Sequence, residues 1–390
     1  MRMNKKKEIV PKLRFPEFIG DKLKITKLGK ISSVVKEKAG ENKYTLMSVT
    51  SGVGLIPQTE KFGREIAGDS YKNYIVIRKY DFAYNKSATK QFPEGYISML
   101  EEYDIAAVPN SIFTCFRITG NESYPPFFDY LWHNNYHGHW LRKYIEVGAR
   151  AHGALSVDTK HLWSMPLALP DFKEQQKIAD CLSSIDELID AENRKLKALE
   201  KYKKGLMQKL FPAEGKALPE WRFPEFRGKS EWRIKPLGKI CTNYDSRRIP
   251  ITEKDRVEGE IPYIGASGVI DYINDFIFDE DLLCVSEDGA NLVARTYPIA
   301  FSISEKTWVN NHAHVLKFSH KYTQDIVESY LNMINLQDFL TGMAQPKLNR
   351  AKLDIIPIPL PEEEEQQKIA GCLSDVDTMI TEQSNKVEQL

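Results

Sequence analysis

The pattern of apolar and polar residues predicts two long helices in this chain of 390 residues. After Asp171, and again after Pro361, apolar residues recur at alternating steps of four and three. A spacing held over this length is typical of a coiled coil, so the two seams are predicted to pair with each other. The alternative, a helix packed on its own domain, stays open. The predicted seam consists of Ile178, Leu182, Ile185, Ile189, Leu196, Leu199, Leu206, Leu210, Ile369, Leu373, Val376, Ile380, Val387 and Leu390.

The start and the length of the first helix can also be predicted. Asp171 is a good N-cap, and Glu174 stands three residues later, where it could return the hydrogen bond. The helix is predicted to end at Phe211-Pro212, so it covers about 40 residues and forms a rod of about 60 Å. Residues 194–209 are strongly basic, which is suited to phosphates or to an acidic partner, although such a run is usually a solvated face.

The sequence is internally repeated. EQQKIADCLS at 174–183 returns as EQQKIAGCLS at 365–374, and RFPEF at 14–18 returns at 222–226. LGKI at 28–31 also returns, at 237–240. The order is therefore head, body and long helix, and then the same again. Because the two bodies share little sequence, we expect two modules that do one kind of job on different targets.

Both bodies are predicted to be α+β domains. Segments such as YTLMSVTSGVGLI, KNYIVIRKYDFAYN and SIFTCFRIT have the β-branched and aromatic bias of strands. The second body has IPYIGASGVIDYI, DLLCVSEDGANLVART and HAHVLKF in the same style. Each body then ends in a predicted helix, over about 127–146 and 324–341.

Composition narrows the class of protein. Hydrophobic residues make up 42% and charged residues 28%, as in ordinary globular proteins. The formal net charge is zero, so any basic surface must arise from local asymmetry. The sequence contains no apolar run long enough for a membrane span and no secretory signal pattern. Five cysteines without a CxxC pair indicate a reducing cytoplasm.

Sequence motifs for catalysis are weak. The sequence has no phosphate-binding loop, nucleophile elbow or HExxH motif. Tyr124-Pro-Pro-Phe127 is one residue away from the motif of amino-group DNA methyltransferases, but Tyr124 cannot accept the base's amino group, and a helix start is the better interpretation. His133 with His137, and His312 with His314, could each present two imidazoles on one face. Stacking or surface roles are favoured over a metal.

The layout closely resembles the specificity subunit of type I restriction–modification enzymes. The likeness rests on the FPEF and LGKI heads, the duplicated EQQKIA helix starts and the KKGLMQKLFP end of the first rod, and it spans essentially the whole chain. The resemblance implies two target-recognition domains that each read half of a split DNA site, separated by two long helices in an antiparallel coiled coil. It also implies two methyltransferase subunits and, in the full complex, restriction subunits as partners. The subunit itself is then non-catalytic and has no cofactor, because S-adenosylmethionine and ATP belong to the partners.

This resemblance divides the chain into residues 1–170, 171–212, 213–360 and 361–390, as domain, helix, domain and helix. There is one departure from the family pattern. Leu390 corresponds to Leu199, so the counterpart of Glu200–Pro212 is missing. Either the chain is truncated or its second rod is short, and both predict weaker docking of one methyltransferase subunit.

Candidate DNA-contacting residues follow from chemistry alone. Arg and Asn in polar loops can reach base edges, whereas Lys usually holds phosphate. The candidates are Asn85, Lys86, Ser87, Lys90, Arg150 and His152 in the first body, and Arg247, Arg248, Asn291, Arg295, Lys347, Asn349 and Arg350 in the second.

Two alternatives stay open. A non-catalytic scaffold of two domains on a coiled coil would show no salt-dependent DNA affinity. A self-contained DNA methyltransferase would bind S-adenosylmethionine without any partner.

Overall fold

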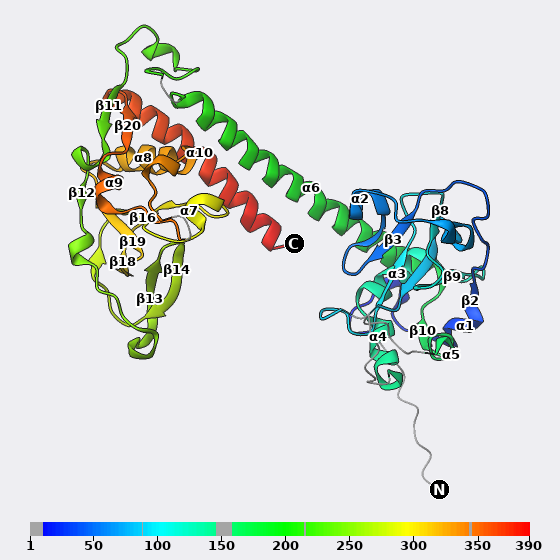
Figure 1. Cartoon of the computed structure of the whole chain (residues 1–390). Helices are drawn as coiled ribbons and strands as arrows, with labels where there is room; N and C mark the ends of the chain where they lie inside the picture. The colour runs from blue at the N-terminus through cyan, green and yellow to red at the C-terminus, as the bar shows by residue number, and fades with distance from the viewer. Residues whose placement is uncertain (1–10, 88, 146–157, 214–215, 343–344) are drawn as a thin grey trace. The chain divides into compact units, whose positions relative to one another are not determined.

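The computed structural model describes residues 11–87, 89–145, 158–213, 216–342 and 345–390. The chain forms two compact units, residues 1–187 and 188–390, and helix α6 (Phe172–Leu210) runs through the boundary (Figure 1). Neither long helix therefore forms a separate structural unit. The first part of α6 packs on the first unit, and the remainder of α6 packs, with α10 (Glu363–Glu388), on the second.

The first unit is a set of small antiparallel sheets flanked by short helices. Its largest sheet has the order β2-β9-β6-β7, and β3 pairs with β4, β5 with β8 and β1 with β10. The strands are β1 Lys24–Lys27, β2 Ser32–Val34, β3 Met47–Thr50, β4 Gly54–Pro57, β5 Ile75–Arg78, β6 Asp81–Asn85, β7 Tyr96–Met99, β8 Ile105–Val108, β9 Phe113–Ile118 and β10 Pro166–Leu169. The helices are α1 Leu28–Ile31, α2 Gln58–Phe62, α3 Pro125–His133, α4 Tyr136–Leu141 and α5 Thr159–Trp163.

The second unit repeats this plan. Its sheets have the orders β12-β19-β16-β17 and β14-β13-β18-β15, and β11 pairs with β20. The strands are β11 Arg233–Pro236, β12 Thr242–Asn243, β13 Glu258–Gly265, β14 Gly268–Ile273, β15 Phe278–Asp279, β16 Leu282–Ser286, β17 Ala300–Ile303, β18 Lys306–Val309, β19 Ala313–Lys317 and β20 Pro357–Leu360. The helices are α7 Asn291–Ala294, α8 Lys321–Met333 and α9 Arg350–Asp354.

The repeated sequence motifs contain the residues that join each head (residues 14–18 and 222–226) to the start of its long helix. Arg14 forms two hydrogen bonds with Glu174, at 2.6 and 2.7 Å. Arg222 does the same with Glu365, at 2.7 Å for both bonds. In both copies the following glutamine (Gln175 or Gln366) donates its side-chain amide to the proline carbonyl five residues earlier. Planar two-bond pairing between guanidinium and carboxylate fixes distance and orientation together, which explains why both copies keep these residues.

One detail of the predicted helix start is wrong. Asp171 does cap α6, because its carboxylate accepts the Glu174 backbone N–H at 2.8 Å. The carboxylate of Glu174, however, binds Arg14 and so does not return the bond to Asp171. A guanidinium that pairs with both carboxylate oxygens is the stronger partner.

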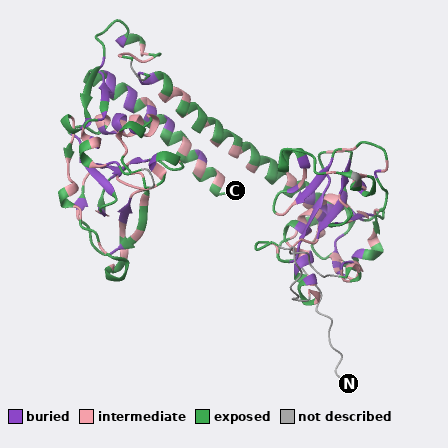
Figure 2. Cartoon of the chain, in the orientation of Figure 1, coloured by how far each residue is buried: buried purple, intermediate pink, exposed green. Residues whose placement is uncertain are grey.

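Each unit buries its own apolar core, visible as the interior strands and helix faces in Figure 2. In the first unit Phe82 stacks on Phe116 with ring centroids 5.2 Å apart, and both are completely buried. In the second unit Leu210 and Phe211, at the end of α6, lie in one core with Ile369 and Leu373 of α10.

The strand predictions are confirmed for the segments that became β3 to β6, β9, β13, β14, β16 and β19. The strand character predicted for the second half of DLLCVSEDGANLVART is wrong, because Asn291–Ala294 forms α7. The prediction of one helix over 127–146 is wrong, because the backbone breaks between α3 and α4. Asn135 there takes a left-handed conformation with φ of +53°. The prediction of a helix over 324–341 is also shifted, since α8 ends at Met333.

The two long helices run antiparallel in the second unit, as expected. The Gln383 side chain of α10 donates to the Glu192 carboxylate of α6 at 2.7 Å. Lys203 of α6 forms an ion pair with Asp377 at 2.5 Å. Because Glu192 and Lys203 of α6 contact Gln383 and Asp377 of α10, the two helices run in opposite directions. The prediction of an antiparallel coiled coil is confirmed for this stretch.

Part of the predicted seam is exposed. Leu182 and Ile185 near the start of α6 are 36% and 41% exposed, and Leu390 is 46% exposed. Their counterparts in α10, Leu373 and Val376, are only 3% and 6% exposed. The prediction of a continuous buried seam is therefore wrong for these positions, because seam burial requires a facing helix and spacing alone does not provide it.

The Arg222–Glu365 pair provides a first prediction. Replacing Arg222 by Met leaves a carboxylate buried without its cation, which we expect to destabilise the second unit by about 3–5 kcal/mol. Lys229→Met, which removes a more exposed partner of Glu364, should cost less than about 1 kcal/mol. Urea unfolding of both variants checks this, and equal effects would contradict it.

His137 provides a second prediction. Its ring is 1% exposed between Tyr84 and Trp132, and burial lowers its pKa to about 4. The unfolded chain therefore binds a proton at this ring more readily between pH 6.5 and 4, so His137 should lower the stability of the first unit by about 3 kcal/mol over that fall, relative to a variant without the histidine. Asp129, whose pKa burial raises to about 6, acts in the opposite direction in both chains. Hydrogen exchange of β6 and β9 in the original chain and in His137→Gln, across this pH range, measures the difference. Exchange whose pH dependence is the same in both chains, or is changed equally by His139→Gln, would contradict the prediction.

Candidate nucleic-acid interface

The candidates of the first body lie on the loop that follows β6. Asn85 ends the strand and is buried, and its side-chain oxygen accepts the Ser87 backbone N–H at 2.9 Å. Asn85 therefore shapes the loop, and its burial argues against contact with a base edge. Lys86 and Ser87 are half-buried, and Lys90 is exposed.

A second loop lies beside this one. Gly52, with φ of +80°, comes close enough to Phe92 that an added Cβ would stand 3.2 Å from the ring. Lys61 approaches the Ser48 hydroxyl at 3.3 Å, and burial lowers the pKa of its ammonium group. The structure thus places the turn at 51–54 beside the loop at 89–95, which carries Lys90.

Two candidates of the second body, Arg248 and Lys347, converge on one carboxylate. Glu287 follows β16, in the position that corresponds to Lys86 after β6. It forms ion pairs with Arg248 at 2.8 Å and with Lys347 at 3.2 Å. Arg248 also donates to the Ala313 carbonyl at 2.7 Å and is largely buried. Arg248 therefore joins two loops, and Lys347 is the more accessible of the two cations.

A buried histidine supports this arrangement. His314 is 1% exposed, with Nδ1 2.7 Å from the Asp245 carboxylate and Nε2 2.7 Å from the Leu348 carbonyl. Both partners are hydrogen-bond acceptors, so the ring links the Asp245 segment to the Leu348 segment. Burial raises the pKa of Asp245, but the hydrogen bond and the charge of His314 outweigh it and leave the pKa lowered. No local sequence pattern points to this network, because its members come from separate segments.

The other candidates differ in accessibility. The Arg247 guanidinium stacks over the Tyr244 ring at 4.6 Å and remains about half exposed. Asn291 exchanges two hydrogen bonds with the backbone of Tyr297, and Arg295 donates to the Leu331 and Ile334 carbonyls. Asn349 caps α9, and Arg350 is exposed. Arg150 and His152 lie outside the described residues.

The structure does not bring His133 and His137 together on one helix face, and the stacking role favoured for them agrees with their ring contacts to Tyr96 and Tyr84. His133 ends α3 and His137 lies on α4, where it is buried, so the two are not neighbours on one helix. His312 is exposed beside Asp288, whereas His314 is buried beside Asp245. Tyr124-Pro-Pro-Phe127 forms the start of α3, which confirms the helix-start interpretation.

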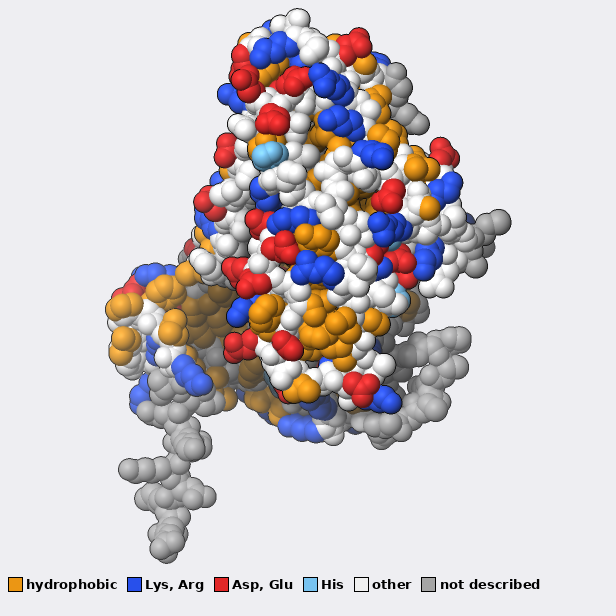
Figure 3. Space-filling model, turned by 90° about the vertical axis from the view of Figure 1, so that its left-hand side faces the viewer, with side chains coloured by type: hydrophobic (Ala, Val, Ile, Leu, Met, Phe, Trp, Pro, Cys, Tyr) orange, Lys and Arg blue, Asp and Glu red, His pale blue; other side chains and the backbone are white. Residues whose placement is uncertain are grey.

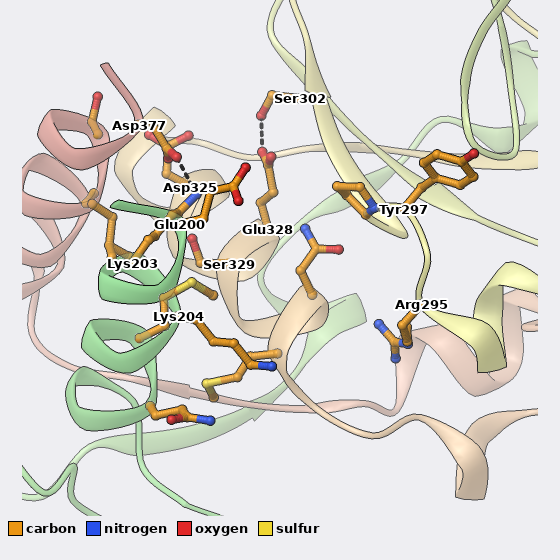
Figure 4. Close-up of a pocket in the computed structure, with 18 of the residues that line it drawn as sticks. Glu200, Lys203, Lys204, Arg295, Tyr297, Ser302, Asp325, Glu328, Ser329 and Asp377 are labelled. Carbon is orange, nitrogen blue, oxygen red and sulfur yellow. Dashed lines mark hydrogen bonds and ion pairs between the residues drawn. The ribbon is translucent and has the colours of Figure 1, made fainter. Parts of the chain in front are cut away.

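The groove shown in Figure 4 lies between α6, α8 and the β16–β17 connection of the second unit, with a volume of about 770 Å³. Two of its lysines form ion pairs: Lys203 with Asp377, and Lys321 with Asp325. Ser302 donates to Glu328 at 2.5 Å, and burial raises the pKa of that carboxyl. The first ion pair joins α6 to α10, whereas the second lies within α8.

The surface charge of the second unit is mixed. Figure 3 shows acidic and basic side chains interleaved on one face, with apolar side chains gathered among them. The exposed apolar residues of this unit include Ile249, Val257, Val269, Ile270, Tyr272 and Phe276. Apolar groups can contact thymine methyl groups, but electrostatics on this face alone does not identify a nucleic-acid binder.

The comparison with protein families decides the assignment. The model of the type I restriction modification DNA specificity domain matches residues 29–201 and again residues 229–389, once for each copy of the repeat. The chain belongs to this family. The two matches include both bodies and both long helices, so they follow the duplicated frame seen in the structure.

Curated relatives agree with this membership. A putative type I restriction enzyme specificity subunit of Haemophilus influenzae is 33% identical over 153 residues, which cover 39% of each chain. The putative MjaX specificity subunit of Methanocaldococcus jannaschii is 28% identical over 63% of this chain and 60% of its own length. The chain thus matches about two fifths to three fifths of these relatives' lengths.

Solved structures share the fold. The S subunit of a type I restriction–modification system from M. genitalium superposes with a TM-score of 0.62 at 14% identity, covering 98% of this chain and 96% of its own. A chain from a study of complex assembly in the type I R-M system superposes with a TM-score of 0.54 at 16% identity, covering 94% of both. Among the described residues, no helix is long and apolar enough to cross a membrane.

The His314 network provides a third prediction. His314→Phe removes both ring nitrogens and their contacts with the Asp245 carboxylate and the Leu348 carbonyl, at a cost of about 1–3 kcal/mol. We expect faster hydrogen exchange at 345–350 and in β19. His312→Phe, at the exposed neighbouring position, serves as the control, and equal exchange in the two variants would show that the buried ring does not hold this loop.

Proposed function

We propose that this chain is the DNA-specificity subunit of a type I restriction–modification enzyme. It reads a bipartite, asymmetric site in double-stranded DNA, one half with each body, and positions two methyltransferase subunits on that site. Restriction subunits join in the full complex. The observation that carries the proposal is one frame, built twice around two different bodies, in a chain of the specificity family.

The paired frames support this division of labour. Each body is closed by the same arginine–glutamate pair and the same pair of strands, β1 with β10 and β11 with β20. The loop after β6 carries Lys86, Ser87 and Lys90, whereas the equivalent loop after β16 begins with Glu287, which forms an ion pair with Lys347. Different side chains at equivalent places suit two recognition modules that read different half-sites.

Within this proposal Lys90, Lys347 and Arg350 contact phosphates or bases of the DNA. Arg247, which stacks over the Tyr244 ring, makes the same kind of contact. Asn85 and Arg248, which are largely buried, and Arg295, which is half-buried, position loops. The subunit performs no catalysis, and its partners bind S-adenosylmethionine and ATP in the cytoplasm.

Sequencing of DNA methylation in the source cell, with and without this gene, tests the function. We expect a split, adenine-methylated motif with a fixed gap to disappear on deletion. A variant with both Lys90→Ala and Lys347→Ala should methylate a smaller fraction of the sites. The sequence of the methylated motif should stay the same, because phosphate contacts carry no base information. A methylome that is the same with and without the gene would overturn the proposal and favour a scaffold.

Helix α6 provides a fourth prediction. Residues 192–203 of α6 are held by α10, so an insertion belongs before them, at the boundary between the two units. Repeating Cys181–Glu187 after Glu187 adds seven residues, about two helical turns or about 10 Å. We expect the gap of the methylated motif to change by about three base pairs, at about 3.4 Å each, while both halves stay the same.

The matched control is Leu188→Ala, which alters the same stretch without altering its length and should keep the original gap. An insertion variant that methylates the original motif would show that α6 does not set the spacing.

A further inference from the structure

Two aromatic rings and a carboxylate hold the Arg247 side chain in one orientation. Its guanidinium carbon lies 4.6 Å from the ring centroid of Tyr244 and 4.8 Å from that of Phe278, and these two rings are stacked 6.5 Å apart. Nη1 donates to the Glu280 carboxylate at 3.2 Å, which is the one hydrogen bond of this guanidinium within the described part of the chain. The other N–H groups therefore keep a fixed direction and remain available to a ligand.

The segment that carries Arg247 is fastened on both sides. Tyr244 donates its backbone N–H to the Val315 carbonyl at 2.7 Å, and the Asp245 carboxylate accepts the Val315 N–H at 2.9 Å. On the other side, the guanidinium of Arg248 donates to the backbone of β19. The side chain of Arg247 is 46% exposed, whereas those of Asp245 and Arg248 are 9% and 13% exposed. The buried neighbours thus form a rigid support for one exposed arginine.

The same support joins Arg247 to the loops that carry other candidate contacts. Arg248 forms an ion pair with Glu287, and Glu287 forms another with Lys347. The segment of Arg247, the loop after β16 and the loop of Lys347 are therefore one connected set. All of them belong to the second unit.

The fixed orientation of Arg247 suits a base better than a phosphate. Lys347 and Arg350 are exposed cations on flexible side chains, which fit the DNA backbone because its charge does not depend on sequence. Arg247 instead presents a planar fork in a set direction. In the major groove, guanine offers N7 and O6 as two adjacent acceptors, and two N–H groups of one guanidinium match them. Adenine, thymine and cytosine do not offer two adjacent acceptors there.

We propose that Arg247 reads a guanine in the half-site bound by the second unit, by donating two N–H groups to its N7 and O6 atoms. Tyr244, Phe278 and Glu280 are positioning residues, because they orient the guanidinium and do not contact the base. The proposal rests on the proposed DNA-reading function and adds to it one residue and one base.

The first unit has a different residue at the equivalent place. Lys38 follows β2 as Arg247 follows β12, and these two strands pair with the equivalent strands β9 and β19. The ammonium group of Lys38 donates to the Asn73 side chain at 3.0 Å. The first unit therefore presents no planar fork here, and the inference concerns one half-site only.

The methylome of cells that carry Arg247→Met tests the proposal. Methionine keeps the length of the side chain but removes every N–H donor, so one G·C position in one half of the methylated motif should accept other base pairs. Discrimination at that position should fall by about tenfold or more, while the other half and the gap stay the same. Lys347→Met is the matched control. It removes one charge from the neighbouring loop and should reduce the methylated fraction without changing the sequence of the motif.

A single-atom change in the DNA provides a second measurement, which needs no variant. In a duplex that carries the motif, 7-deazaguanine replaces N7 by C–H and keeps Watson–Crick pairing. The original chain, assembled with its methyltransferase subunits, should bind about fivefold or more weakly when the guanine at that position is replaced. Arg247→Met, if it assembles, should bind the two duplexes equally.

Two results would overturn the proposal. The first is an Arg247→Met methylome with the original motif at a lower methylated fraction, as expected for a phosphate contact, or with relaxation at an A·T position. The second is a motif in which no guanine of either half is sensitive to the loss of N7. Failure of the proposed function is different from both, since deletion of the gene would then leave the methylome unchanged.

Discussion

The structure depends on the bidentate ion pair that joins each head to the start of its long helix. Arg14 and Glu174 are 160 residues apart, and Arg222 and Glu365 are 143 residues apart, so each pair closes a whole body into a loop. Both carboxylates are almost completely buried, and a buried carboxylate without its guanidinium would be costly. The pair therefore fixes where the helix leaves the body, whatever the body contains.

This constraint separates the frame from its contents. Around each pair the same small parts recur, including a stacked lysine: Lys177 lies over Phe15, and Lys368 lies over Phe223. Inside the frame, the loops after β6 and β16 carry unrelated residues and can change without disturbing the helix start. A scaffold of this kind tolerates divergence at the recognising surface, which is the property that a reader of variable DNA sequences requires.

The candidate contacts show which parts of a site can be predicted from sequence. Lys90 and Lys347 are predictable as cations in polar loops, and the structure places both at the surface. Asn85 and Arg248 have the same kind of sequence context, yet both are used inside the protein. Their partners, Ser87 for one and Glu287 with Ala313 for the other, decide this. For Arg248 those partners are 39 and 65 residues away, beyond the reach of any local pattern.

The sequence by itself determined the duplicated frame, the α+β bodies and the two long helices, because each depends on short repeats or on local periodicity. Only the tertiary structure decided which half of a seam is buried. Leu182 and Leu373 occupy the same place in the same motif, but a helix covers Leu373, whereas Leu182 lines an open groove. Periodicity specifies which side of a helix is apolar, and burial depends on whether another segment of the fold reaches that side.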